Sequence, residues 1–123
     1  MTATDIKGLT DAVTLYLDLM YDCDLAKFAR VFYPSSQLHG YRDGRMTCWP
    51  AAHYRQVLAD RKSPKSLGVP REDQILLLDF AAPTQALTKV RARIGEIVYV
   101  DHLTYHKIDG HWLITSKAYH REA

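Results

Sequence analysis

The fold of this chain is decided by residues 97–120, which read IVYVDHLTYHKIDGHWLITSKAYH. Apolar and polar side chains alternate on both sides of Asp109-Gly110, and a period of two is typical of strands with one buried face. The Asp-Gly dipeptide favours the positive φ angles of a two-residue hairpin turn. The segment therefore predicts two antiparallel strands, residues 97–108 and 111–120, with Ile108 opposite His111.

A two-residue turn also predicts the register of the whole ribbon, because each step away from the turn moves both strands by one residue. The pairs expected on one face are Tyr105 with Ile114, Leu103 with Ser116, Asp101 with Ala118, and Tyr99 with His120. The residues expected on the other face are His102, Thr104, His106, Leu113, Thr115 and Lys117.

A second tight turn at Gly95-Glu96 predicts that a strand over residues 86–94 pairs with residues 97–108. Thr88, Val90, Ala92 and Ile94 then join the face of Asp101. That face is mostly apolar, so we expect it to pack on helices. The opposite face, with Lys89, Arg91, Arg93 and Lys117, is expected to lie in or around a dimer interface; anion binding there is the alternative.

The rest of the chain predicts three helices, a hairpin and one more strand. Apolar residues at steps of three and four predict a helix over residues 4–21, and a shorter helix from Leu25 to Phe32 ends at Pro34. Asp43-Gly44 predicts a hairpin between residues 38–42 and 45–49, and Pro50 begins a helix that ends near Asp60. Residues 62–72 read as a surface loop that could serve as a lid, followed by a strand over residues 74–80.

Composition bounds the function classes. A length of 123 residues predicts one domain, residues 1–123. The net charge of +2 comes from 16 basic and 14 acidic residues scattered along the chain, so nucleic acid is not an expected partner. No apolar run reaches the roughly 20 residues of a membrane span, and no export signal is visible, so we expect a cytoplasmic protein without a membrane partner. His102 and His106 lie too far apart along a strand to share a metal ion, and we expect no metal and no cofactor.

The inner face of the C-terminal ribbon predicts a cavity. Large side chains at one end give way to small ones at the other, where Asp101, Tyr99 and His120 are expected. A carboxylate on an apolar face is costly unless it is paired or used, so Asp101 is the first catalytic candidate. With His120 as its partner it would act as a general base, and Tyr99 or Tyr16 would donate to the oxyanion. The alternative is a structural Asp that hydrogen-bonds a tyrosine or a helix end.

Further side chains are candidates for ligand binding, although aromatic residues at such spacing are more often core than binding site. The full set of ligand-binding candidates is Tyr16, His39, Tyr41, Trp49, Tyr54, Tyr99 and Tyr105.

Several motifs together resemble a known group. They are Tyr16-Leu17-Asp18, Phe32-Tyr33-Pro34, residues 40–44, Trp49-Pro50, Asp101-His102-Leu103-Thr104 and Asp109-Gly110-His111-Trp112. In these motifs and in the order of its elements the chain is similar to the nuclear transport factor two-like (SnoaL-like) superfamily, in the branch described as putative lumazine-binding. The resemblance implies an α+β cone, also called a cystatin-like α+β roll, with a pocket at its open end and a homodimer across the outer sheet face. Relatives include ketosteroid isomerase, scytalone dehydratase and SnoaL-like polyketide cyclases, but none of their catalytic sets matches here residue by residue.

Two functional hypotheses follow from these observations. The first is a small-molecule-binding domain, with an isomerase, dehydratase or cyclase activity through Asp101 and an unidentified ligand. The second is a non-catalytic dimeric interaction module whose cone is filled by its own side chains. An open pocket lined by Asp101 and Tyr99 favours the first, and a plug of aromatic side chains favours the second.

Overall fold

The computed structural model describes residues 1–122. The elements follow in the order α1 (Ala3–Asp22), the 3₁₀ helix η1 (Leu25–Lys27), α2 (Phe28–Val31), β1 (Phe32–Arg42), β2 (Arg45–Pro50), α3 (Ala51–Asp60), β3 (Asp73–Ala82), β4 (Gln85–Ile94), β5 (Ile97–Ile108) and β6 (His111–Arg121). The helix predicted over residues 4–21 and the strands of the C-terminal half are confirmed to within a few residues at their ends.

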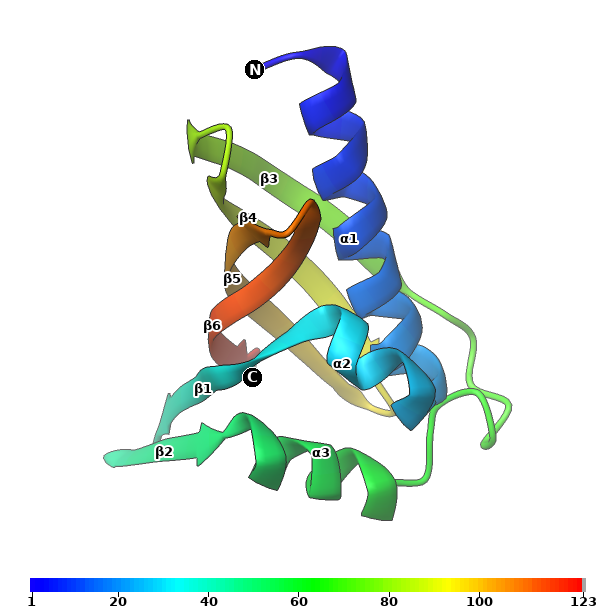
Figure 1. The fold of residues 1–123 in the computed structure, drawn as a ribbon. Helices are drawn as coiled ribbons and strands as arrows, with labels where there is room; N and C mark the ends of the chain where they lie inside the picture. The colour runs from blue at the N-terminus through cyan, green and yellow to red at the C-terminus, as the bar shows by residue number, and fades with distance from the viewer. Residues whose placement is uncertain (123) are drawn as a thin grey trace.

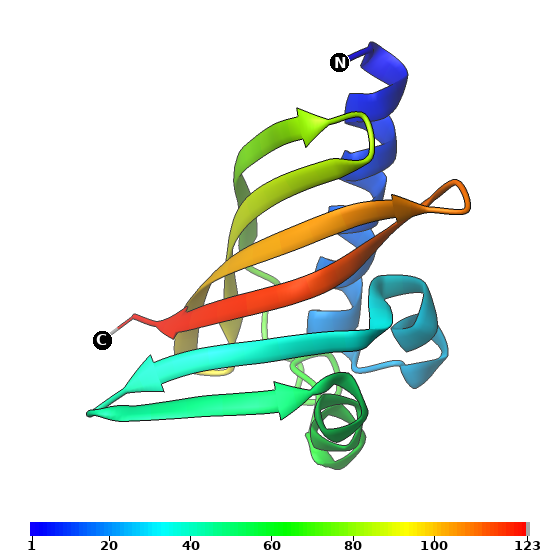
Figure 2. The same cartoon turned by 60° about the vertical axis from the view of Figure 1, so that its left-hand side comes forward.

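The six strands form one sheet in the order β2-β1-β6-β5-β4-β3. Neighbouring strands are antiparallel except β1 and β6, which run parallel. Figures 1 and 2 show the sheet bent around α1, which runs along its inner face, while α3 lies beside β1 and β2. The predicted α+β cone is therefore confirmed, with one parallel strand pair that the sequence did not indicate.

Helix α1 begins at a capping box. The Thr2 hydroxyl accepts a hydrogen bond from the Asp5 backbone N–H at 3.1 Å, and the Asp5 carboxylate accepts one from the Thr2 backbone N–H at 3.0 Å. Val13, Tyr16 and Met20 lie on the buried stripe of this helix, as their spacing predicts. The cap therefore holds a helix whose inner face presents a tyrosine to the middle of the sheet.

The two ends of the cone are filled differently. Near the β5–β6 turn, Trp112 and Ile114 are buried, and the Trp112 ring meets Phe80 edge-to-face at 5.9 Å. At the other end β4 contributes Ala92, and β5 contributes Asp101 to the same inner face. Large side chains thus close one end of the cone, and the predicted change to small and polar side chains opens the other.

The second helix is shorter than predicted. α2 ends at Val31, and Phe32 already begins β1, which therefore starts six residues before the strand predicted over residues 38–42. Phe32 pairs with Ile114 of β6, and its ring stacks on Phe28 at 4.9 Å. A long-range strand partner therefore overrides the local helical spacing.

The β4–β5 register is the predicted one along its whole length, but the β5–β6 register is not. From the Asp109-Gly110 turn to the pair Tyr105 and Ile114 the pairing is as expected. Thr115 is then an extra residue in β6, a β-bulge, and every later pair is displaced by one. The structure pairs Leu103 with Lys117, Asp101 with Tyr119, and Tyr99 with Arg121, so the predicted pairs Leu103 with Ser116, Asp101 with Ala118, and Tyr99 with His120 are wrong.

The bulge exchanges the faces of the last strand. Thr115 Oγ1 lies 2.6 Å from His106 Nδ1 and donates to the Thr104 carbonyl at 3.4 Å, so its side chain stabilises the extra residue. Beyond it Lys117 is buried and lies on the inner face, contrary to prediction, whereas Ser116, Ala118 and His120 are exposed. Within residues 1–122, no helix combines the length and apolarity that crossing a membrane requires.

Candidate functional site

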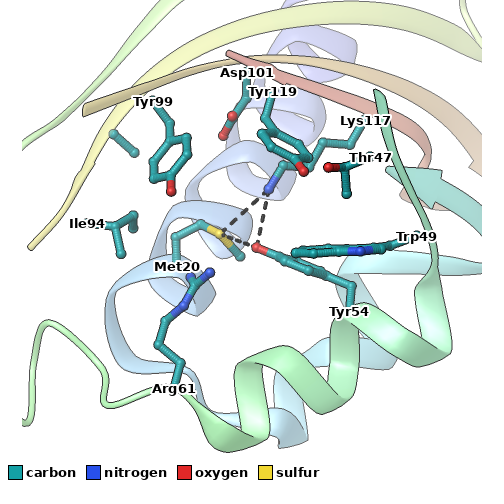
Figure 3. A pocket seen from close by; sticks show the side chains of 11 residues that line it. Met20, Thr47, Trp49, Tyr54, Arg61, Ile94, Tyr99, Asp101, Lys117 and Tyr119 are labelled. Carbon is teal, nitrogen blue, oxygen red and sulfur yellow. Dashed lines mark hydrogen bonds between the residues drawn. The ribbon is translucent and has the colours of Figure 1, made fainter. Parts of the chain in front are cut away.

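A cavity of about 240 Å³ lies at the open end of the cone (Figure 3). The helices and the loop after α3 contribute Met20, Tyr54 and Arg61, and strand β2 contributes Thr47 and Trp49. The far wall comes from Ala92, Ile94, Tyr99, Asp101, Lys117 and Tyr119 of strands β4, β5 and β6. Arg61 directly precedes the 62–72 loop, but no residue of that loop lines the cavity, so its role as a lid stays a prediction.

Asp101 is held by a tyrosine of α1. Its side chain is buried with 3% exposure, and its Oδ2 accepts a hydrogen bond of 2.6 Å from Tyr16 Oη. Burial, and next the negative charge of Asp101, raises the pKa of Tyr16 well above its ordinary value of 10.0. Tyr16 is therefore a neutral donor at physiological pH. Asp101 Oδ1 has no hydrogen-bond partner within residues 1–122, so one carboxylate oxygen remains uncommitted.

Lys117 is the second polar group of the pocket. It is 5% exposed, and its Nζ donates to Tyr54 Oη at 3.3 Å. The Nζ also lies over three aromatic rings, 4.7 Å from the centroid of Tyr54, 5.1 Å from that of Tyr16 and 5.9 Å from that of Tyr119. No carboxylate of residues 1–122 forms an ion pair with it. The ammonium is thus held by ring faces and one hydroxyl rather than by a counter-charge.

Aromatic rings form the other walls of the cavity. Trp49 stacks on Tyr54 with centroids 6.2 Å apart and planes inclined at 24°, and it lies 6.3 Å from Tyr119. Tyr99 meets Tyr119 edge-to-face at 6.3 Å. These rings leave a space bordered by flat apolar surfaces, into which the Asp101 and Lys117 side chains point (Figure 3).

Gly40 of β1 makes the position of Tyr119 possible. It pairs with Tyr119 across the parallel β1–β6 ladder, and a Cβ on Gly40 would lie 2.3 Å from the Tyr119 ring. That separation is far below van der Waals contact, so any larger residue would displace the ring. Gly40 is therefore needed for the shape of the pocket wall.

The structure brings together some of the predicted site residues. Asp101, Tyr99, Trp49 and Tyr54 line the cavity, and Tyr16 lies behind Asp101 as its hydrogen-bond donor. The alternative expectation, an Asp that hydrogen-bonds a tyrosine for structural reasons, thus holds for one of the two carboxylate oxygens of Asp101, Oδ2.

Four other predicted residues lie elsewhere. His120 is exposed on the outer face, so the expected proton sharing between Asp101 and His120 is wrong, because the bulge turns His120 away. His39 is exposed on β1, and Tyr41 is 63% exposed. Tyr105 is buried outside the cavity lining; its hydroxyl has no partner within residues 1–122, and burial raises its pKa.

Sequence reasoning missed Lys117, Tyr119 and Arg61. An uninterrupted alternation along β6 predicts Lys117 on the outer face, and the bulge reverses that prediction. One signal was present in the sequence: Ile114 and Tyr119, both large, lie five positions apart, and a regular strand places residues at an odd spacing on opposite faces. Within residues 1–122, no group of three or more His, Cys, Asp or Glu side chains is arranged to hold a metal ion.

Comparisons with known proteins agree with this architecture. A family model described as putative lumazine-binding matches residues 4–120. Two solved structures are similar over nearly the whole of both chains: an NTF2-like protein of unknown function from Silicibacter pomeroyi DSS-3 (21% identity, 99% of this chain and 100% of that chain, TM-score 0.86) and one from Shewanella baltica OS155 (18% identity, 100% and 98%, TM-score 0.87).

A third similar structure is a ketosteroid isomerase-like protein from Erwinia carotovora atroseptica SCRI1043, with 11% identity, 99% coverage of both chains and a TM-score of 0.76. At these identities the likeness shows the fold alone. No curated protein matches this chain.

Proposed function

The chain belongs to the putative lumazine-binding family of the NTF2-like superfamily, and on this basis we propose that it binds a small organic molecule inside its cone. One observation carries the proposal. The cavity of about 240 Å³ has aromatic walls, its lining includes the Asp101 and Lys117 side chains, and the buried Asp101 Oδ1 has no hydrogen-bond partner among residues 1–122. A mostly apolar pocket with a few convergent polar groups is the usual form of a ligand site.

The same geometry supports proton transfer at carbon as the reaction. Asp101 Oδ1 would take a proton from a carbon next to a carbonyl group, and the electron pair of that C–H bond would move onto the carbonyl oxygen. Lys117 would then donate to this oxygen, in place of the Tyr16 or Tyr99 of the sequence-based scheme, because Tyr16 already donates to Asp101 and Lys117 has donors to spare. Return of the proton to a different carbon completes an isomerisation.

Exchange of carbon-bound hydrogen tests this assignment without knowledge of the natural substrate. The probe is 2-tetralone, a bicyclic ketone, incubated with the protein in D₂O while ¹H NMR follows the loss of the protons next to its carbonyl. We expect the protein to accelerate this loss and Asp101→Asn to reduce the acceleration by about 10²- to 10⁴-fold. Asparagine keeps an acceptor for Tyr16, which limits damage to the fold.

The matched control is Asp79→Asn, which removes an exposed carboxylate from β3. It should leave the exchange rate unchanged. A wild-type rate equal to that of buffer, or an unaltered rate in Asp101→Asn, would remove Asp101 from any catalytic role.

A homodimer through the outer sheet face belongs to the same proposal. Leu77 of β3 and Leu87 of β4 lie opposite Lys89 and Asp79 and are 46% and 37% exposed. Exposed leucines on a sheet face favour contact with another chain. An open pocket, however, speaks against the second hypothesis, in which the cone is filled and serves only as an interaction module.

A further inference from the structure

On the basis of the proposed small-molecule function, we propose that the pocket selects a flat organic anion. The charged oxygen of this anion lies against Lys117 Nζ. The chemical class is an aromatic or conjugated acid of one or two rings, with a carboxylate or an ionised enol as its charged group.

The charge of the pocket is the first reason to expect an anionic ligand. Its lining includes two cationic side chains, Lys117 and Arg61, and one carboxyl group, that of Asp101. Neither cation forms an ion pair within residues 1–122. A positive charge buried to 95% without a counter-ion is costly, and an anionic ligand would remove that cost.

The hydrogen-bonding capacity of Lys117 is the second reason to expect an anionic ligand. An ammonium has three N–H donors. One is directed to Tyr54 Oη at 3.3 Å, and the only other polar contact among residues 1–122 is Met20 Sδ at 4.0 Å, a weak acceptor. At least one strong donor therefore remains available on the side that Figure 3 shows facing the cavity. A ligand oxygen would occupy it with a charge-assisted hydrogen bond.

The walls determine the shape of the ligand. Trp49 and Tyr119 present ring surfaces to the cavity, and Tyr99 closes it from the β5 side. The volume of about 240 Å³ lies below the roughly 300 to 1,000 Å³ of pockets for drug-sized molecules. A molecule of one or two fused rings is the size that such a cavity admits, and a flat one gains most from stacking on its walls.

Three probes of one shape and different charge test the proposal by isothermal titration calorimetry at pH 7.5: 2-naphthoate, 2-naphthamide and 2-naphthylmethylamine. We expect 2-naphthoate to bind at least about tenfold more tightly than the neutral amide, and the cationic amine to bind more weakly than the amide. The indole N–H resonance of Trp49 should shift on binding, while that of Trp112, at the closed end of the cone, should not.

Lys117→Met keeps an unbranched side chain, shorter by one atom, and removes its charge, so it should reduce the preference for naphthoate over naphthamide to less than about threefold. Lys107→Met, at an exposed position of β5 close to the β5–β6 turn and outside the cavity lining, is the matched control and should retain the full preference. Lys117→Arg keeps the charge and should retain most of the preference for naphthoate. This variant keeps the test informative if the methionine variant is poorly folded.

The outcomes separate this inference from the proposed function. Equal binding of naphthoate and naphthamide with a shifted Trp49 resonance overturns anion selection and leaves a small-molecule pocket. Binding of none of the three probes overturns both. A preference for naphthoate that survives in Lys117→Met shows that another cation is responsible, and the assignment to Lys117 is then wrong.

Discussion

Asp101 and Lys117 enter the same pocket from neighbouring strands, and each is held by tyrosines rather than by the other. Tyr16 donates to Asp101, Tyr54 accepts from Lys117, and within residues 1–122 no ion pair joins the two charged side chains. An internal salt bridge would have satisfied both groups and left little for a ligand. Their separation therefore preserves the capacity to bind an acceptor at Lys117 and a donor at Asp101.

The raised pKa of Tyr16 predicts a loss of stability in alkali. Burial favours the neutral phenol in the folded state, so the stabilising contribution is complete below the unfolded-state pKa of about 10 and is lost as the pH rises toward the folded-state pKa. The free energy of unfolding, measured by urea titration between pH 9 and pH 11.5, should fall with increasing pH. The fall should be shallower in Tyr16→Phe.

The exposed Tyr41 gives the matched control for that experiment. Tyr41→Phe should reproduce the wild-type slope, because the Tyr41 side chain is 63% exposed and its substitution removes no buried hydroxyl. Parallel slopes for wild type and Tyr16→Phe would contradict the role assigned to the buried phenol. Tyr105, whose pKa is also raised by burial, should contribute to the slope that remains in the variant.

At the scale of the element, the bulge in β6 decides which side chains form the pocket. Thr115 adds one residue between Ile114 and Ser116 and so changes the phase of the alternation. Without it, the same strand would present small side chains to the cavity and Lys117 to the outer face. A single extra residue thus leaves the part of β6 near its turn regular and turns Lys117, farther along the strand, toward the cavity.

Thiol labelling measures directly which residues of β6 face outward beyond the bulge. In a Cys23→Ala, Cys48→Ser background, single cysteines are placed at positions 117 and 118 and treated with Ellman's reagent. We expect Ala118→Cys to react rapidly and Lys117→Cys slowly, because Ala118 is exposed and Lys117 is 5% exposed. A regular ladder would reverse this order of rates, and reversal would refute the bulge.

At the scale of the whole molecule, the outer face of the sheet is available for a second copy of the chain. Light scattering coupled to size-exclusion chromatography should give twice the mass of one chain for the wild type. Leu87→Glu, which places a charge on that face, should give the mass of one chain. Leu67→Glu, at a leucine of the 62–72 loop that is 58% exposed against 37% for Leu87, should remain dimeric. A monomeric wild type would exclude this assembly.

Much of the fold was predictable because it follows from neighbours along the chain. The helical spacing of α1, the turns at Asp109-Gly110 and Gly95-Glu96, and the inward direction of Asp101 all depend on a few adjacent residues, and all are confirmed. Two residues of the cavity wall followed from these patterns: Tyr99 and Asp101 come from a strand whose β4 partner is in the predicted register.

The sequence by itself therefore determined the α+β architecture and the acid of the pocket, since hydrophobic periodicity and turn chemistry act over short distances. Only the tertiary structure decided that Lys117 and Tyr119 face the cavity and that His120 does not. That choice depends on the bulge at Thr115 and on the parallel pairing of β6 with β1, where Gly40 leaves room for the Tyr119 ring. These contacts join residues far apart in the chain, and the free energy of burying the aromatic ring outweighs the local preference for an unbroken strand.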